Sequence, residues 1–139
     1  METFPAASYA GGLVGYNDGG TISNSAALGE SVTVKTGSIR GVGRIYGYPA
    51  TNIGNGNYAL DSMSVKFATS YDGALESQTV VPGLTTPDGA NATIFDFMDS
   101  RFWIEKLRFN LVDGGRPANP TVWNFSRVAN EGFPRLEWE

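Results

Sequence analysis

The sequence predicts an all-β fold: a right-handed β-helix, or β-solenoid, with an aromatic C-terminal cap that contains short helical turns. Three observations predict it. A motif near the start of the chain recurs about 32 residues later, a spacing typical of stacked repeats. Glycine supplies 18 of the 139 residues and, with abundant Asn, Ser and Thr, indicates many tight turns between short strands. Apolar residues show helical spacing only after residue 90.

The two copies of the motif share the order of their short segments. The first runs from Gly11 to Leu28 and the second from Gly43 to Leu60. Each has a glycine and a short apolar strand, then Gly-Tyr, a polar turn and two more short segments. Three short strands in each copy predict one coil per copy, with Leu13 stacked over Ile45 at the strand spacing of about 4.8 Å.

The same alignment stacks Ile22 over Ile53. It places Gly15 and Gly47 where the chain bends sharply or packs closely against itself, because glycine has no side chain to obstruct either. An alternative architecture is a twisted sheet or sandwich of hairpins, which also uses glycine-rich turns.

Each copy is followed by a stretch in which polar and apolar residues alternate. Residues 31–36 read Ser-Val-Thr-Val-Lys-Thr and residues 62–67 read Ser-Met-Ser-Val-Lys-Phe. Alternation with a period of two predicts a strand with one buried face.

The rest of the chain is predicted as an irregular coil at 68–90, with a short strand at 80–81, and a C-terminal capping region at 91–139. Residues 91–107 carry bulky side chains partly at helical spacing, with acids early and bases late, which favours one or two short helices. Strands are expected at 121–125 and 132–138. We therefore expect a single domain over 1–139, with the two repeats at 10–67.

Composition excludes several classes of function. The chain has no cysteine and no histidine, which removes disulfides, thiolate zinc sites, cysteine nucleophiles and histidine-dependent catalysis. The net charge is −4 and the ten basic residues are scattered, so no nucleic-acid partner is expected. No apolar run reaches the roughly 20 residues of a membrane span, so no direct membrane insertion is expected. No metal or cofactor is predicted.

The best candidate ligand-binding residues are tyrosines of the repeats. Tyr16 and Tyr48 occupy matching positions and would form an outward aromatic ladder, with Tyr46 and Tyr58 close by. Such a ladder can hold sugar rings or a protein partner through apolar ring faces. The alternative is that these rings pack over the corners of the coils and shield the glycine-rich turns.

Four aromatic residues are predicted to form a structural cap: Trp103, Trp123, Phe133 and Trp138. The end of a coil exposes unpaired backbone and apolar core, so arrays need distinct terminal segments. A binding cleft is the alternative.

Two polar features have a structural and a chemical interpretation. Asp96 and Asp99 could be paired carboxylates of a polysaccharide-cleaving site, or acids that favour the start of a helix. The Asn17–Gly20 turn could offer oxygen ligands to calcium, but it matches no calcium-loop spacing, and a plain turn is the simpler interpretation.

The segment Gly11–Asn17, followed by Gly20–Ser25, resembles the GLUG repeat, named for its Gly-Leu-hydrophobic-Gly core. Such repeats occur in large secreted and surface proteins of bacteria. The resemblance implies β-solenoid architecture, an extracellular or cell-surface location and adhesion, and we expect the chain to be a piece of a longer protein.

The second copy departs from this pattern, with Arg44 in place of Gly12 and Pro49 in place of Asn17. The C-terminal aromatic pattern at 102–136 resembles the segment that closes such arrays.

The predicted function is a non-catalytic structural or adhesive module of a secreted or cell-surface bacterial protein. Its partner would be an unknown protein or glycan on a host or neighbouring cell, and self-association through the N-terminal edge of the solenoid is a further expectation. A carbohydrate-binding module that uses the tyrosines is the alternative, and a fragment of a β-helix carbohydrate-active enzyme is the one with least support.

Overall fold

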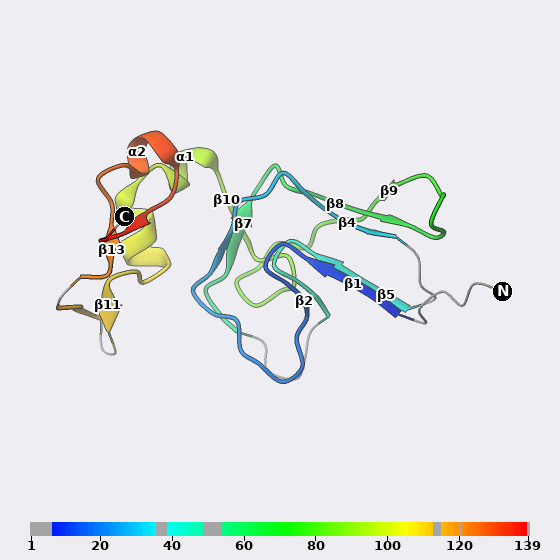
Figure 1. Ribbon diagram of the computed structural model, residues 1–139, viewed down its shortest axis with the longest axis horizontal. Coiled ribbons are helices and arrows are strands. Elements are labelled where there is room, and N and C mark those ends of the chain that lie inside the picture. Colours follow the sequence, from blue (N-terminus) through cyan, green and yellow to red (C-terminus); the bar gives the residue numbers. More distant parts are fainter. Residues whose placement is uncertain (1–6, 36–38, 49–53, 113–114, 120, 139) are drawn as a thin grey trace. The chain divides into compact units, whose positions relative to one another are not determined.

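A computed structural model describes residues 7–35, 39–48, 54–112, 115–119 and 121–138 (Figure 1). In these residues the chain is mostly short strands with a few short helices, which confirms the all-β character. The chain divides into two compact units, Met1–Asn91 and Ala92–Glu139, where the sequence analysis expected one domain with a C-terminal region from residue 91. No helix in the described ranges is long and apolar enough to cross a membrane.

The first unit contains two layers of short strands, one from each copy of the motif. The first layer consists of β1 (Ala7–Gly11), β2 (Val14–Tyr16), β3 (Ala26–Ala27) and β4 (Ser31–Lys35). The second layer consists of β5 (Ile39–Gly43), β6 (Tyr46–Tyr48), β7 (Tyr58–Leu60) and β8 (Ser64–Ala68).

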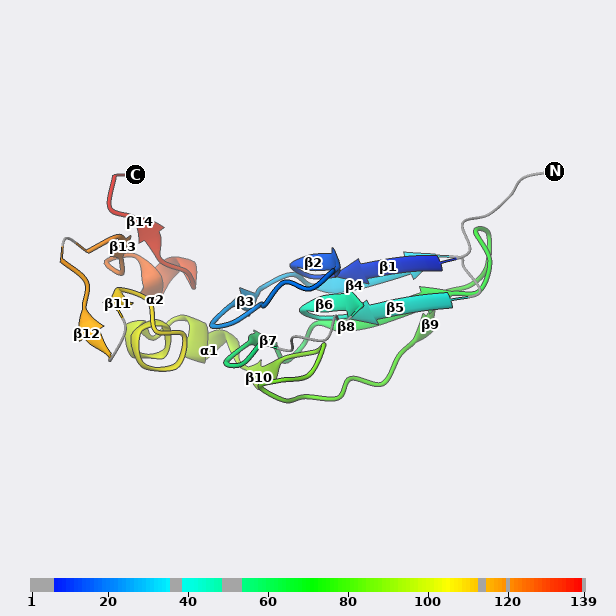
Figure 2. The ribbon, with the colours of Figure 1, turned by 90° about the horizontal axis from the view of Figure 1, so that it is seen from below.

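Every first-layer strand pairs in parallel with its counterpart in the second layer (Figure 2). Val14 pairs with Tyr46 and Ala26 with Tyr58, an offset of 32 residues, so the predicted repeat spacing is confirmed. From β1 to β8, no strand pairs with the next one along the chain, as strands joined in hairpins would.

Individual contacts support the predicted stacking. The Leu13 N–H donates to the Ile45 carbonyl at 3.0 Å. The predicted partner of Ile22, Ile53, lies outside the described residues, as does Pro49.

Glycine is needed where the layers approach each other. A Cβ on Gly47 would lie 2.6 Å from the Ala10 nitrogen and 2.6 Å from the Gly15 oxygen. Because these contacts are to backbone, no side-chain movement could relieve them. The predicted role of Gly47 as a point of close packing is therefore confirmed.

The core of the first unit lies between the strands and follows the alternation of the sequence. Along β4, Val32 and Val34 are buried and the residues on either side are exposed, as predicted for a strand with one buried face. The remaining buried apolar residues come from the rest of both layers: Ala27, Val42, Ile45, Tyr46, Ala59, Met63 and Val65.

Residues 76–92 cover part of the second layer, so the segment predicted as irregular coil has a defined structural role. β9 (Glu76–Ser77) runs antiparallel to β8, and β10 (Ala90–Ala92) joins the sheet of β7 and β3. The strand predicted at 80–81 is not formed, although Val80 packs half-buried against the core.

One hydrogen-bond pattern recurs between successive parts of the first unit. The N–H groups of Leu13 and Val14 both donate to the Ile45 carbonyl, and those of Ile45 and Tyr46 both donate to the Pro87 carbonyl. The Pro87 carbonyl thus accepts two successive N–H groups of the second layer, as the Ile45 carbonyl accepts two of the first. Sequence comparison could not find this partial third layer, because it lacks the motif.

The second unit consists of short helices and two-residue strands. Its helices are α1 (Ile94–Phe97), the π-helix η1 (Phe102–Lys106) and α2 (Val128–Glu131), and its strands are β11 (Leu111–Val112), β12 (Arg116–Pro117), β13 (Trp123–Asn124) and β14 (Arg135–Leu136). The helices predicted between 91 and 107 are formed, whereas α2 was not predicted. The buried apolar side chains of the second unit are Ala92, Phe97, Trp103, Leu107 and Val128.

Candidate functional site

Three tyrosines of the first unit form a surface group that we call the tyrosine cluster: Tyr9, Tyr16 and Tyr48. Tyr16 and Tyr48 face each other across the β2–β6 pair, with ring centroids 5.2 Å apart and an interplanar angle of 12°. Tyr9 lies tilted against both, at 5.3 and 5.0 Å. Tyr16 is 53% and Tyr48 41% exposed, so these two rings form the outward ladder that the sequence predicted.

The other two tyrosines assigned to the candidate site lie elsewhere. Tyr46 is a core residue, only 2% exposed, and its hydroxyl donates to the Thr85 carbonyl at 3.5 Å. Burial raises the pKa of Tyr46, and the negative charge of Asp88 raises it further. Tyr46 is therefore removed from the candidate contact surface. Tyr58 is half-buried on β7, opposite Ala26.

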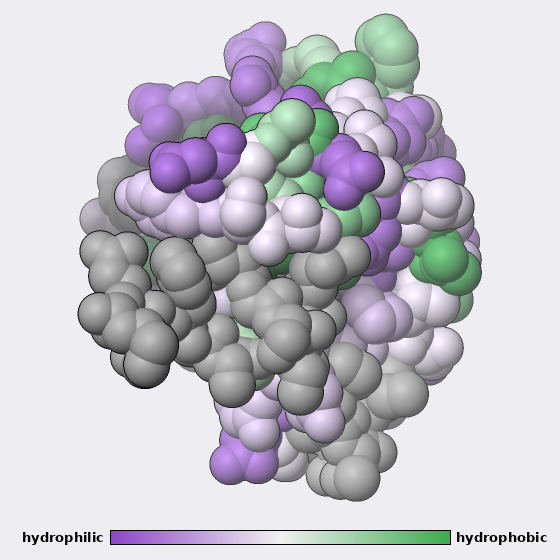
Figure 3. All heavy atoms as spheres, turned by 90° about the vertical axis from the view of Figure 1, so that its right-hand side faces the viewer, coloured by the Kyte–Doolittle hydropathy of each residue, from purple (hydrophilic) through white to green (hydrophobic). Residues whose placement is uncertain are grey.

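The tyrosine cluster offers contact surface rather than reactive groups. Tyr16 and Tyr48 cover one ring face of each other, which leaves outer faces, ring edges and hydroxyls for a partner. Aromatic rings of this kind combine apolar area with a polar end. Among the coloured residues on the face shown in Figure 3, hydrophilic and hydrophobic side chains are interspersed.

The polar turn that could have offered calcium ligands is closed on itself. The Asn17 side-chain amide donates to the Gly20 carbonyl at 2.7 Å, and the Gly20 N–H donates back to the Asn17 Oδ1 at 3.0 Å. Asn17 is nearly buried in this role. In the part of the chain that the structure describes, no three His, Cys, Asp or Glu side chains come together as a possible metal site.

The most polar buried site of the first unit surrounds Arg44, which is 0% exposed. Its guanidinium donates to the carbonyls of Asp88 at 2.9 Å, Leu60 at 3.2 Å and Gly89 at 3.0 Å. A further bond reaches the Asn91 side chain at 2.8 Å. A buried charge needs extensive hydrogen bonding of this kind to be tolerated.

The Asp88 carboxylate completes the site by accepting backbone N–H groups. Its Oδ1 accepts from Arg44 at 3.1 Å and its Oδ2 from Val81 at 2.8 Å. Desolvation lowers the pKa of the Arg44 side chain, and the charges of Asp88 and Asp61 oppose that effect. These hydrogen bonds join residues 81–91 to the second layer.

In the sequence, Arg44 stands out only as a departure from Gly12 of the first copy. The sequence feature that could have indicated its buried role is the arginine itself, which takes the place of a glycine at a position flanked by apolar residues. Its partners are 16 to 47 residues away in sequence, which the motif could not reveal.

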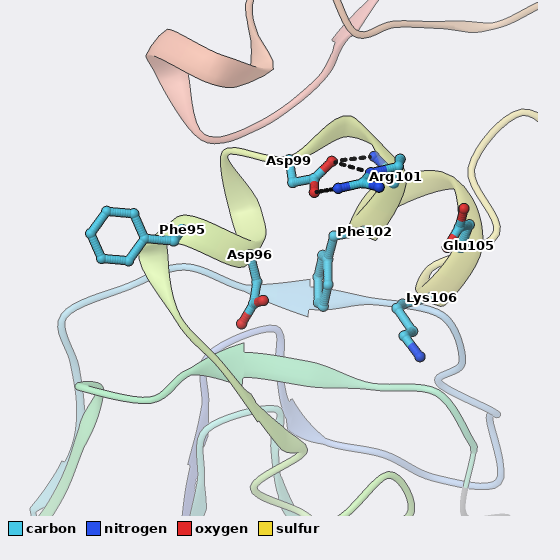
Figure 4. A pocket seen from close by; sticks show the side chains of 7 residues that line it. All are labelled: Phe95, Asp96, Asp99, Arg101, Phe102, Glu105 and Lys106. Carbon is cyan, nitrogen blue, oxygen red and sulfur yellow. Dashed lines mark hydrogen bonds and ion pairs between the residues drawn. The ribbon is translucent and has the colours of Figure 1, made fainter.

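A hollow of about 320 Å³ lies on the second unit, lined by Phe95, Asp96, Asp99, Arg101, Phe102, Glu105 and Lys106 (Figure 4). It contains the two aspartates considered as paired carboxylates. Asp96 is part of a capping box: the Thr93 N–H donates to its Oδ2 at 2.7 Å and its own N–H donates to Thr93 Oγ1 at 3.1 Å. This arrangement begins α1, as the structural interpretation expected.

Asp99 is paired with a neighbouring arginine. Arg101 donates to both of its oxygens, at 3.3 and 2.9 Å, and the Arg101 N–H adds a third bond at 2.9 Å (Figure 4). These bonds lower the pKa of Asp99. Asp99 is therefore not a raised-pKa acid of the kind that glycoside hydrolysis requires.

The four predicted cap residues differ in burial within the second unit. Trp103 is 3% exposed and donates its indole N–H to the Phe97 carbonyl at 2.8 Å. Trp123 is half-buried on β13, with its ring 4.8 Å from that of Phe109. Phe133 is 42% and Trp138 74% exposed. Trp103 therefore belongs to the core of this unit, Trp123 packs half-buried against Phe109, and Phe133 and Trp138 lie on its surface.

In a comparison with known families, a family described as "The GLUG motif" matches residues 6–33, which contain the first copy of the repeat. The predicted resemblance of that segment is confirmed. No curated protein and no solved structure matches the chain.

Proposed function

We propose that the first unit of this chain, which carries a GLUG motif, is part of a right-handed β-solenoid. The solenoid serves as a structural or adhesive module of a secreted or cell-surface bacterial protein. Its partner is a protein or glycan outside the cell. The module acts by display: stacked layers hold exposed turns and side chains in fixed positions, without catalysis.

The observation that carries this proposal is the parallel pairing of the two layers at an offset of 32 residues. Parallel in-register pairing of successive copies is the arrangement by which solenoids stack their repeats. The exposed groups, including Tyr16 and Tyr48, lie on the outside of these layers. The proposed secreted or cell-surface location of the protein is supported by the GLUG motif alone.

Engineered disulfides test the stacking, because the natural chain has no cysteine. Thr33→Cys with Lys66→Cys places two cysteines at directly paired positions. Such positions fall within the Cα separation that a disulfide spans. We expect rapid crosslinking in the folded protein, and none for Thr33→Cys with Ser64→Cys, which are out of register. Equal crosslinking of both pairs would contradict ordered layers.

Adhesion is tested with beads coated with the chain and mixed with bacterial or host cells. We expect the coated beads to bind cells more than beads coated with an unrelated acidic protein of similar size. Antibodies to the chain should label intact source cells. A chain that is found only inside the cells would refute the surface location.

Carbohydrate binding through the tyrosine cluster is a second candidate function. The stacked, exposed rings of Tyr16 and Tyr48 favour it, because sugar rings pack against aromatic surfaces of this kind. Tyr46 takes no part, since it is buried.

A glycan-array screen tests this candidate with a matched control. The wild-type chain is compared with the Tyr16→Ala/Tyr48→Ala double variant and with Tyr71→Ala, which removes an exposed tyrosine of the same unit outside the cluster. Binding by the wild type and by Tyr71→Ala, with loss in the double variant, would support it. No binding by any of the three would leave display to a protein partner as the better account.

A further inference from the structure

We infer that two copies of this chain associate through the first-layer edge, with β4 of one copy antiparallel to β4 of the other about a two-fold axis. This inference goes beyond display and does not depend on it, because it rests on unpaired strand edges and on burial.

The first-layer strands are paired on one side only. Within the described residues, β1 pairs with β5, β2 with β6, β3 with β7 and β4 with β8, and no strand lies on their other side. An exposed strand edge presents free N–H and C=O groups that favour pairing with another chain.

Equivalent positions in the two layers differ in exposure. Leu13 is 44% exposed, whereas Ile45, its counterpart, is completely buried. Gly12 is likewise exposed and Arg44 buried. Residues 76–92 cover part of the second layer, whereas no described strand flanks the outer side of the first. A second chain that covers the first layer would therefore bury the side chain of Leu13, as the equivalent side chain of Ile45 is already buried in the second layer.

The covered second layer decides the geometry of association. β8 is flanked by β9 and β7 by β10, and the Pro87 carbonyl accepts the N–H groups of Ile45 and Tyr46. In the described residues β5 has no strand on its outer side, and its Val42 carbonyl accepts the Gln78 side-chain amide at 2.9 Å. The opposite side of another copy is therefore blocked for a first-layer edge at β6, β7 and β8. Two first-layer edges can meet each other, which gives a closed pair rather than a filament.

β4 is the first-layer strand best suited to this pairing. It is five residues long and holds Val32, Thr33 and Val34, residues with high strand propensity. β1 has the same length but is composed mainly of Ala, Ser and Gly, and β2 and β3 have only three and two residues. The Ser64 N–H donates to the Glu30 carbonyl at 3.1 Å. Because backbone groups alternate along a strand, those of Ser31, Thr33 and Lys35 then point away from β8.

These three residues make the edge self-complementary. With Thr33 on the two-fold axis, Thr33 faces its own copy and Ser31 of each chain faces Lys35 of the other. Every outward N–H of the three then meets an outward carbonyl, as in the narrow pairs of an antiparallel ladder. The side chains of Ser31, Thr33 and Lys35 are already exposed, so the pairing requires no rearrangement of buried side chains.

Sedimentation velocity of the full chain over a series of concentrations tests the inference. We expect a reversible monomer–dimer equilibrium in the micromolar range, since one five-residue strand pair is a small interface. Ser31→Lys places like charges opposite each other twice and should raise the Kd about tenfold, whereas Ser31→Glu places opposite charges there and should lower it by a similar factor. Thr33→Pro removes the central donors and should abolish the dimer.

Ser64→Lys and Ser64→Glu are the matched controls, because Ser64 pairs with Ser31 in register but lies on the second layer. They should leave the dimer Kd unchanged. Retained far-ultraviolet circular dichroism separates loss of association from loss of fold. A strictly monomeric wild type, an open-ended assembly, or a dimer indifferent to all changes at Ser31 and Thr33 would overturn the inference.

Discussion

The two units are held together by different kinds of contact. In the first unit, strands pair with partners about 32 residues away, and buried Arg44 binds carbonyls 16 to 45 residues away. In the second unit, the main contacts are aromatic and closer in sequence: Phe97, Trp103, Phe109 and Trp123 form a chain of rings with neighbouring centroids 4.8 to 5.6 Å apart. The first unit therefore depends on backbone register between layers, and the second on side-chain packing over short sequence distances.

This difference can be measured separately in each unit, because the chain distributes its fluorophores unequally. All six tyrosines lie before residue 72 and all three tryptophans after residue 102. Tyrosine near-ultraviolet signals thus report on the first unit and tryptophan fluorescence on the second.

The largest effect is expected from Arg44→Ala. It removes the guanidinium bonds to the carbonyls of Leu60, Asp88 and Gly89, leaves the buried Asp88 carboxylate without its opposite charge and creates a cavity, which should cost about 3–5 kcal/mol of unfolding free energy. Denaturant titration followed by the tyrosine signal measures it. Arg101→Ala, an exposed control, should change little. If Arg44→Ala were as stable as wild type, the buried site would not join residues 81–91 to the second layer.

Gly54→Ala tests the close approach of the layers. A Cβ at Gly54 would overlap the backbone carbonyl of Ile22, so we expect a loss of about 1–3 kcal/mol in the tyrosine-detected transition. Gly29→Ala is the control, because its Cβ would meet only the end of Met63, at 3.8 Å. Equal stabilities of the two variants would argue that the layers are not in close contact at this point.

Trp103→Phe tests the second unit. It removes the indole bond to the Phe97 carbonyl and some buried volume, which should lower stability by about 2 kcal/mol in the transition followed by the remaining tryptophans. Trp138→Phe, at a ring that is 74% exposed, should have an effect within about 0.5 kcal/mol. A shift of the tyrosine signal as large as that of tryptophan would show that the two units do not unfold independently.

The smallest effect is expected from Glu131→Gln. The Arg135 hydrogen bond at 2.7 Å, helped by the charges of Arg135 and Arg127, lowers the pKa of Glu131 below its usual 4.5. A lowered folded-state pKa stabilises the fold above pH 4.5, and the stabilisation is lost as the pH falls through the lowered value. The Tm difference between wild type and variant should therefore be constant from pH 7 to about 5 and close in acid. A difference that persists at about pH 2 would assign it to packing rather than charge.

Much of the first unit could be predicted from local pattern. The motif gave the offset of the layers, and the alternation at 31–36 gave β4 with Val32 and Val34 inward, because both patterns reflect regular backbone geometry. The capping box at Thr93 and Asp96 also depends on neighbours in sequence. The partial layer at 76–92 escaped prediction because its contacts are made by single residues, such as Pro87, without a repeat.

In the candidate site, Tyr46 and Tyr48 show the same limit of prediction from local pattern. Tyr46 and Tyr48 occupy positions of the same parity on β6, so alternation places both side chains on one side of the strand. Only Tyr46 is covered, because the Pro87 carbonyl binds its N–H and the Thr85 carbonyl accepts its hydroxyl bond. Tyr48 remains in the tyrosine cluster with Tyr16.

By itself, the sequence determined the all-β character, the spacing of the repeat and the positions of its glycines and short helices, since each depends on residues a few positions apart or on a visible copy. Tertiary structure alone decided which tyrosines face a partner, why Arg44 can be buried, and which layer has a free edge. These properties depend on contacts across tens of residues, where the identity of one side chain does not reveal its partner until the chain has folded.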